Sequence, residues 1–148
     1  METTLVLLKP DSVQRGLIGQ IVSRFENKGL KIVGMKMMQL SEEIVTEHYD
    51  FLADKPFFPG IKAYMTGSPV VAMAISGTNV IKTVRNLTGA TNPAEALPGS
   101  IRGDFALTID ANIIHASDSE ETAKIELNRF FKQEEITSYT KISDKTVG

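Results

Sequence analysis

The sequence predicts an α/β sandwich in which helices cover one face of a four-stranded, mainly antiparallel sheet. Three observations favour this class. Short apolar runs typical of strands alternate with helical stripes, the gaps between strands are too long for hairpins, and no glycine-rich phosphate loop follows the first strand. A doubly wound parallel sheet is the weaker alternative, because it would want such a loop where Lys9-Pro10-Asp11-Ser12 stands.

The first half of the chain predicts two strands, each followed by a helix. Residues 3–8 form a β-rich apolar run that ends at a proline and an aspartate. Apolar residues at helical spacing from Ile18 to Phe25 then lead to Gly29, a residue typical of helix C-termini. Residues 30–38 predict the second strand, and Ser41 is a good N-cap for the helix after it.

The second half predicts two further strands among irregular segments. Residues 55–60 combine two prolines, a glycine and two phenylalanine rings, so we expect a functional loop or a hinge with buried rings. Residues 70–75 predict a central strand, followed by a helix that ends at Gly89. From residue 90 to 104 the periodicity disappears, which makes this long stretch a functional candidate. Residues 111–116 predict the last strand, and the serines after it predict the cap of a final helix.

The resulting order β-α-β-α-β-α-β predicts the ferredoxin-like split βαβ arrangement. At 148 residues and 16.2 kDa the chain is close to one typical domain. We therefore expect a single domain over residues 1–148, with residues 136–148 as a C-terminal tail.

Composition excludes several kinds of chemistry and partner. The chain has no cysteine, which excludes disulfides, zinc ribbons and thiol nucleophiles. With 16 basic and 18 acidic residues, the chain lacks the overall positive charge that would bind nucleic acid, so any anion-binding site must be local. The longest apolar stretch, residues 69–75, is too short to span a bilayer, and no basic leader precedes the first strand. These features predict a cytoplasmic protein without a membrane partner.

One glycine pair imitates a phosphate loop. Gly29 and Gly34 have its spacing, but Met35-Lys36 follows where lysine and serine or threonine are needed. A helix-ending glycine followed by a strand explains the pattern.

His115 is the strongest candidate for chemistry. It lies at the end of a predicted strand and just before a helix. An unprotonated imidazole is nucleophilic near neutral pH, provided that a second group fixes its tautomer. Ser117 and Glu126 carry suitable groups, although a helix cap and a solvated helix face explain them equally well. His48, on an apolar helical stripe, indicates packing or surface, and two histidines without a ligand cluster make a zinc site improbable.

Six blocks of sequence resemble one enzyme family. They are Lys9-Pro10-Asp11, Arg15-Gly16, Phe57-Phe58-Pro59-Gly60, Thr91-Asn92-Pro93, Pro98 through Phe105, and Asn112 through Ser119. In order and spacing they resemble the nucleoside diphosphate kinases from end to end. Two departures are small: Ser12 stands where glycine is common, and Ile61 where leucine is frequent.

The resemblance implies transfer of the γ-phosphoryl group from a nucleoside triphosphate, such as ATP, to a nucleoside diphosphate. It implies a phosphohistidine on His115, formed at Nδ1, with Ser117 and Glu126 orienting the ring. It also implies six further polar residues of the active site, namely Lys9, Tyr49, Arg85, Thr91, Arg102 and Asn112. Of these, Lys9 and Asn112 would bind the ribose. Phe57 would stack on the base, with Ile61 beside it. Magnesium would be carried by the nucleotide phosphates, with Asp118 reaching it through water and no direct protein ligand.

General chemistry agrees with this assignment. Phosphoryl transfer spreads charge over three equatorial oxygens, which two guanidiniums, one ammonium and Mg²⁺ suit. One site serves both substrates in a ping-pong reaction, and a stacking ring reads no donor pattern, so we expect broad base tolerance.

Two other functional classes stay open at this point, and so does the assembly. The chain could be a non-catalytic nucleotide-binding module, or a histidine phosphocarrier that passes its phosphate to a protein partner. The resemblance also implies a homo-oligomer. Residues 136–148 approach the longer C-terminal tail associated with hexamers in this family, so a hexamer is favoured over a tetramer.

Overall fold

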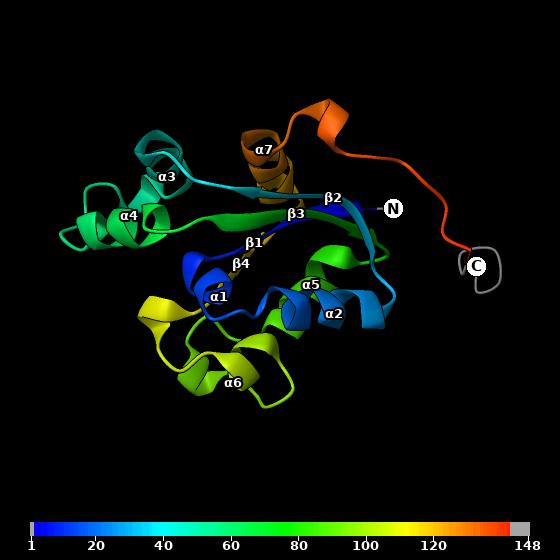
Figure 1. Ribbon diagram of the computed structural model, residues 1–148, viewed down its shortest axis with the longest axis horizontal. Helices are drawn as coiled ribbons and strands as arrows, with labels where there is room; N and C mark the ends of the chain where they lie inside the picture. Colours follow the sequence, from blue (N-terminus) through cyan, green and yellow to red (C-terminus); the bar gives the residue numbers. More distant parts are fainter. Residues whose placement is uncertain (1, 143–148) are drawn as a thin grey trace.

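The computed structural model describes residues 2–142 and places one sheet between two layers of helices (Figure 1). The strands are β1 (Glu2–Leu8), β2 (Lys31–Met38), β3 (Val70–Gly77) and β4 (Ile114–Ala116). Their order is β2-β3-β1-β4, and every pair of neighbours is antiparallel. The predicted four-stranded antiparallel sheet is confirmed.

Helices and short turns connect the strands. The helices are α1 (Pro10–Gln14), α2 (Ile18–Lys28), α3 (Glu42–His48), α4 (Phe58–Thr66), α5 (Val80–Thr88), α6 (Ile101–Phe105) and α7 (Glu120–Phe130). Single 3-10 turns are η1 (Asp50–Leu52), η2 (Pro93–Glu95), η3 (Ile109–Ala111) and η4 (Gln133–Glu135).

Both faces of the sheet are covered, so the expectation of helices on one face was wrong. Val6 and Leu8 of β1 pack with residues of α2, α5 and α6 on one side. Leu5 and Leu7 pack with residues of α3, α4 and α7 on the other side. Side chains of a strand alternate between faces, and here both sets are apolar and buried, which requires a helix layer on each side (Figure 1).

The caps predicted from the sequence are present. Gly29 ends α2 in the left-handed region at φ 98°, where a side chain would be strained. The hydroxyl of Ser41 accepts from the backbone N–H of Ile44 at the start of α3. At α7 the capping residue is Ser119, which accepts from the N–H of Thr122. Ser117, two residues earlier, is free of that duty and takes part in the site below.

The irregular segments hold more helix than the sequence predicted. α4 begins at Phe58 inside the expected loop, and α1 begins at Pro10, because proline is tolerated in the first turn of a helix. The two rings of the loop differ: Phe58 is buried, whereas Phe57 is 55% exposed. α6 and η2 occupy parts of the stretch expected to be irregular.

The last strand is shorter than predicted. Residues 109–111 form η3, and Ile113 has φ 59°, so regular pairing with β1 starts only at Ile114. Of the expected tail, residues 136–142 follow η4, where the N–H of Thr137 donates to the carbonyl of Val33 in β2. Residues 143–148 lie outside the described part of the chain.

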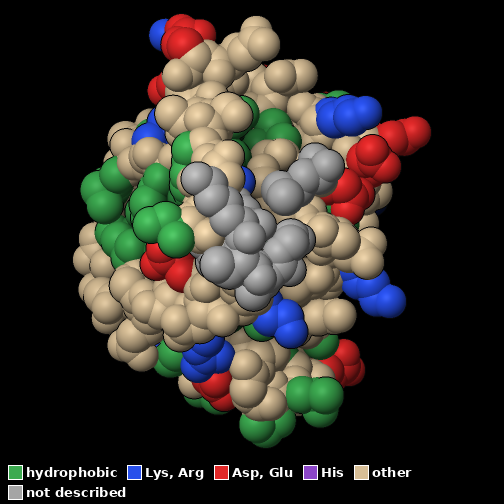
Figure 2. All heavy atoms as spheres, turned by 90° about the vertical axis from the view of Figure 1, so that its right-hand side faces the viewer, with side chains coloured by type: hydrophobic (Ala, Val, Ile, Leu, Met, Phe, Trp, Pro, Cys, Tyr) green, Lys and Arg blue, Asp and Glu red, His purple; other side chains and the backbone are tan. Residues whose placement is uncertain are grey.

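The surface carries charges of both signs. On the face shown in Figure 2, lysine and arginine side chains alternate with aspartate and glutamate rather than forming one broad basic area. No helix within residues 2–142 is both long enough and apolar enough to cross a membrane.

Replacing Phe25 by alanine tests the packing of α2 on the sheet. Phe25 is fully buried in that core, and truncating a buried phenylalanine leaves a cavity, so we expect the free energy of unfolding to fall by about 3–5 kcal/mol. Urea denaturation followed by circular dichroism measures the loss. Asn27→Ala, at an exposed position of the same helix, is the control and should change it by less than about 0.5 kcal/mol. An equally small change for Phe25→Ala would contradict the packing.

Candidate active site

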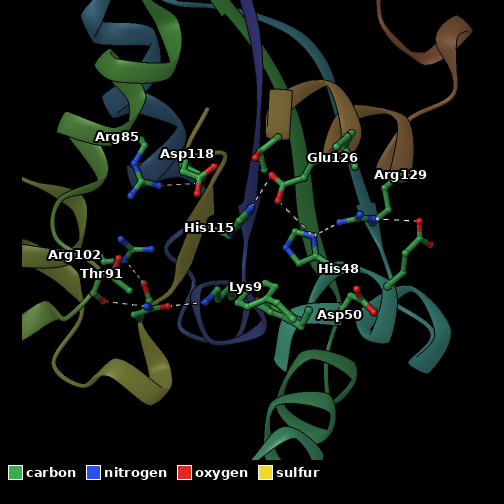
Figure 3. A pocket seen from close by; sticks show the side chains of 17 residues that line it. Lys9, His48, Asp50, Arg85, Thr91, Arg102, His115, Asp118, Glu126 and Arg129 are labelled. Atoms are coloured by element: carbon green, nitrogen blue, oxygen red, sulfur yellow. Dashed lines mark hydrogen bonds and ion pairs between the residues drawn. The ribbon is translucent and has the colours of Figure 1, made fainter. Parts of the chain in front are cut away.

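A cavity of about 830 Å³ opens where β4, the end of β1 and helices α3, α5 and α7 meet (Figure 3). Most polar residues singled out in the sequence line it, although they come from distant segments. They are Lys9, Tyr49, Arg85, Thr91, Arg102, Asn112, His115, Asp118 and Glu126. The structure therefore brings together the cations of Lys9, Arg85 and Arg102 around one cavity, which the sequence could not show.

His115 and Ser117 share one carboxylate oxygen. Nε2 of His115 lies 2.9 Å from Oε1 of Glu126, and the Ser117 hydroxyl donates to the same oxygen at 2.6 Å. An ionised carboxylate only accepts, so in the neutral ring of His115 the hydrogen is on Nε2. Nδ1 then keeps its lone pair, and no hydrogen bond within the described residues occupies it. The side chain of His115 is 23% exposed, so this nitrogen is accessible from the cavity.

Glu126 is buried but stays ionised. It projects from α7, and its side chain is only 7% exposed. Burial by itself raises the pKa of Glu126, but the hydrogen bond and charge of His115, together with the hydrogen bond from Ser117, lower the pKa below its usual value. The carboxylate is therefore available to balance positive charge on the His115 ring.

Arg102 is held by three backbone carbonyls. It lies in α6 and donates to Gly89 at 3.0 Å, to Asn112 at 3.3 Å and to Ile114 at 2.6 Å. Burial, together with the charge of Arg85, lowers the pKa of Arg102 to about 10, so the side chain is a cation at neutral pH. Arg85 donates to the carbonyl of Ala116 at 3.1 Å. Both guanidiniums are anchored to the strand that carries His115 or to its flanks.

Lys9 and Asn112 form a linked polar pair. The ammonium of Lys9 donates to Oδ1 of Asn112 at 2.7 Å, and the amide of Asn112 donates to the carbonyl of Thr91 at 3.1 Å. Burial first, and the charge of Arg102 second, lower the pKa of Lys9 to about 8. Burial also raises the pKa of Tyr49 to about 12, with the charge of Glu126 adding to it, so its phenol remains a hydrogen-bond donor.

Phe57 and Ile61 lie outside this cavity but next to it. They line an adjoining, largely apolar cavity of about 850 Å³, which shares Lys9 and Tyr49 with the first. Ile109 and Asp110 of η3 line the same cavity and were missed in the sequence, because they fall between the irregular stretch 90–104 and the strand predicted from residue 111. Two adjoining spaces, one lined by many charged side chains and one largely apolar, suit a ligand with an anionic end and a flat apolar end.

His48 and Arg129 were also not recognised as part of the site. His48 is buried, as a packing residue would be, but its ring packs edge-on against that of His115 at 4.6 Å between centroids. A nitrogen of the Arg129 guanidinium lies 2.9 Å from Nδ1 of His48. Only the spacing of Arg129, one helical turn after Glu126, could have indicated that it faces the same way.

The donor set does not fit a resident metal ion. Ligand atoms of His48, His115 and Glu126 lie within 4.8 Å of one another. However, Glu126 already accepts from His115 and Ser117, and the Arg129 cation occupies His48. Asp118, an exposed carboxylate on the cavity wall, is the group suited to a hydrated Mg²⁺ brought by a ligand.

Comparison with known proteins points to one family. The family profile described as nucleoside diphosphate kinase matches residues 2–136. A nucleoside diphosphate kinase of Methanocorpusculum labreanum is 56% identical over 97% of both chains. Nucleoside diphosphate kinase A of Homo sapiens is 52% identical over 94% of this chain and 91% of its own. A halophilic nucleoside diphosphate kinase from Halobacterium salinarum, solved in complex with CDP, superposes with a TM-score of 0.95 at 44% identity, covering 99% of this chain and 98% of that one.

The lowered pKa of Lys9 predicts a pH-dependent affinity for adenosine diphosphate. Below a pH of about 8 the side chain is an ammonium, so we expect affinity to fall as the pH rises from about 7.5 to 9, where the nucleotide's own phosphate ionisation is complete. Isothermal titration calorimetry measures it. Lys9→Met should bind about tenfold more weakly at pH 7.5 and lose this dependence.

Lys124→Met, at an exposed position of α7, is the matched control and should behave as the unmodified protein. An unchanged affinity in Lys9→Met would show that the ammonium does not contact the phosphates.

Proposed function

Because the chain belongs to the nucleoside diphosphate kinase family, and is thus an enzyme that transfers a phosphoryl group from a nucleoside triphosphate to a nucleoside diphosphate, we propose that His115 holds this group between the two substrates. The observation that supports this assignment is the bond from Nε2 of His115 to Glu126, which leaves Nδ1 as the nucleophile. Because the members of this family are enzymes that act on nucleotides, we set aside the two other functional classes, a non-catalytic nucleotide-binding module and a protein phosphocarrier.

The proposed reaction has two matching steps. Nδ1 of His115 attacks the γ-phosphorus, and the bond to the bridging oxygen breaks as the nitrogen–phosphorus bond forms. The electron pair leaves with the nucleoside diphosphate, and the ring gains positive charge that the Glu126 carboxylate balances. A terminal oxygen of the second diphosphate then attacks the same phosphorus and frees His115. Donor and acceptor use one site, so the kinetics are ping-pong.

The polar cavity supplies positioning and charge. We assign the phosphates to Arg85, Arg102 and Lys9, which line the cavity, since cations that are already oriented stabilise the transferring group. Thr91 and Tyr49 add hydroxyl groups on the same lining. Mg²⁺ travels with the nucleotide, where it neutralises charge on the phosphate oxygens, and Asp118 would bind its water shell.

The apolar cavity suits the base. We assign stacking to Phe57, whose ring is 55% exposed, with Ile61 and Ile109 as apolar neighbours. A stacking ring accepts every base because each has a π face, which supports broad base tolerance. Lys9 lines both cavities and donates to Asn112 in the first, so we assign this pair to the ribose as well as the Lys9 ammonium to the phosphates.

We propose that the enzyme assembles as a homohexamer, with a tetramer as the alternative, and acts in the cytoplasm, where its substrates are used. β2 forms one edge of the sheet and pairs only with β3 among the described strands. Its Met35 and Met37 are 48% and 59% exposed, and an apolar open edge invites pairing with another chain. Leu97 and Leu107 are 76% and 86% exposed and offer a second apolar contact.

Sedimentation equilibrium tests the assembly. We expect a mass near six times the 16.2 kDa of one chain, and a smaller species for Met37→Glu, because a buried unpaired charge opposes the contact. Lys28→Glu, which changes charge at an exposed position of α2, is the control. A monomer at micromolar concentration would contradict the proposal.

His115→Ala tests the central assignment. With radiolabelled ATP, the unmodified enzyme should gain label that resists alkali, is lost in acid and passes to GDP. His115→Ala should gain none and show no measurable transfer in a coupled assay, since the other imidazole of the site, His48, is buried and its Nδ1 is occupied by Arg129. Free imidazole should restore a small part of the activity. Asn128→Ala, at an exposed position of α7, should keep full activity, and full activity in His115→Ala would overturn the assignment.

A further inference from the structure

Arg129 is a largely buried cation for which the proposed reaction has no role. It projects from α7 one turn after Glu126, and its side chain is only 11% exposed. Burying a guanidinium is expensive unless its donors are used. Its partners therefore indicate what it does.

The guanidinium of Arg129 points toward His48 (Figure 3), whose ring packs against that of His115. One terminal nitrogen lies 2.9 Å from Nδ1 of His48. Its Nε lies 3.4 Å from Oε1 of Glu47, without a hydrogen bond. Because the side chain of Glu47 is 65% exposed, that ion pair is weak, and His48 is the partner with defined geometry.

This contact determines the tautomer of His48. A guanidinium has no acceptor, so it can only donate to Nδ1, which must then carry a lone pair. In the neutral ring the hydrogen is consequently on Nε2. Ring contacts with His115 at 4.6 Å and with Phe130 at 5.2 Å hold the imidazole in place.

The tautomer matters because Nδ1 of His48 faces the carboxylate that orients the nucleophile. It lies 3.8 Å from Oε2 of Glu126, whose other oxygen serves His115 and Ser117. A hydrogen on this nitrogen would give His48 a donor pointing at Glu126, and a small rotation would bring the two into a hydrogen bond. Glu126 would then be drawn away from His115.

We propose that Arg129 is a positioning residue: by donating to Nδ1 of His48 it keeps that nitrogen from donating to Glu126, and so reserves the carboxylate for His115. This inference rests on the proposed role of His115 as the phosphate carrier. Arg129 touches neither substrate nor the reacting atoms, and it acts through His48 and Glu126.

The charges around His48 support a neutral ring. The titratable groups that face it, or face its partner Arg129, are Glu47 and Tyr49 of its own segment, Lys9 at the end of β1, His115 of β4, and Glu126 and Arg129 of α7. Burial, and next the charge of His115, lower the pKa of His48 to about 3; Arg129 and Lys9 add to this, whereas Glu126 acts against it. His48 thus stays unprotonated from pH 5 upward, and only the position of its hydrogen is left to be set.

The tautomer can be observed directly in the full-length protein. The chain has only two histidines, so His115→Ala assigns their signals in two-bond ¹⁵N–¹H correlation spectra. We expect the unmodified protein to show His48 with a bare Nδ1 and a protonated Nε2. A protonated Nδ1 would overturn the inference without any variant of Arg129.

Arg129→Leu then tests the consequence for the reaction. A share of His48 should shift to the Nδ1–H tautomer, and phosphoenzyme formation at saturating ATP should slow about tenfold, the usual effect of a lost hydrogen bond to a charged group. The affinity for adenosine diphosphate should change by less than about twofold, because the phosphate-binding cations are untouched. Arg129→Lys should recover most of the rate, since an ammonium can also donate to Nδ1.

Lys124→Leu, a cation removed from an exposed position of the same helix, should leave both readouts unchanged, and circular dichroism confirms that each variant is folded. If Arg129→Leu keeps the tautomer and the rate, the inference is wrong although the enzyme works. If the unmodified protein forms no acid-labile phosphoenzyme, the proposed function itself fails.

Discussion

The hydrogen bond between the buried carboxylate of Glu126 and Nε2 of His115 is the interaction on which the rest of the site depends. A buried carboxylate without partners would be unstable, and the donors of His115 and Ser117 compensate for its burial and keep it ionised. Because an ionised carboxylate accepts and never donates, the hydrogen of His115 is confined to Nε2. The packing of α7 on the sheet thus selects the nitrogen that we propose to react, and in our proposal Arg129, through His48, protects this arrangement from a competing donor.

The fold holds the proposed nucleophile, His115, and the proposed phosphate-binding cations as one unit. β4 has only three residues and pairs only with β1 within the described chain. Arg102 secures it by donating to the carbonyls of Asn112 and Ile114, and the backbone N–H of Lys9 donates to the carbonyl of Ile113. Ile113 lies between them at φ 59°, a costly conformation for a β-branched residue that its complete burial maintains. A shift of the Arg102 guanidinium or of the Lys9 backbone would therefore move the segment that carries His115.

Strong periodicity predicted the four strands and the long helices, but it did not predict the short helices or the two-sided packing. A helical stripe shows which side of a helix is buried and leaves open which face of a sheet it covers. The near-continuous apolar runs of β1 and β3 were the available signal for burial on both faces. Pro10 indicated the end of a strand and Pro59 an irregular loop, but both also stand in the first turn of a helix, where no backbone donor is lost.

What the sequence determined by itself was local. The helix caps and the strands depend on residues that are close together in the sequence. The same holds for His115, Ser117 and Glu126, which lie within one strand–helix unit and are therefore kept near one another. What only the tertiary structure decided were the contacts between distant segments. The bond between Arg129 and His48 joins residues 81 positions apart, and it exists because α3 and α7 pack on the same face of the sheet. The spacing of residues in the sequence does not predict this contact, because the packing of α3 beside α7 results from many apolar contacts across the core.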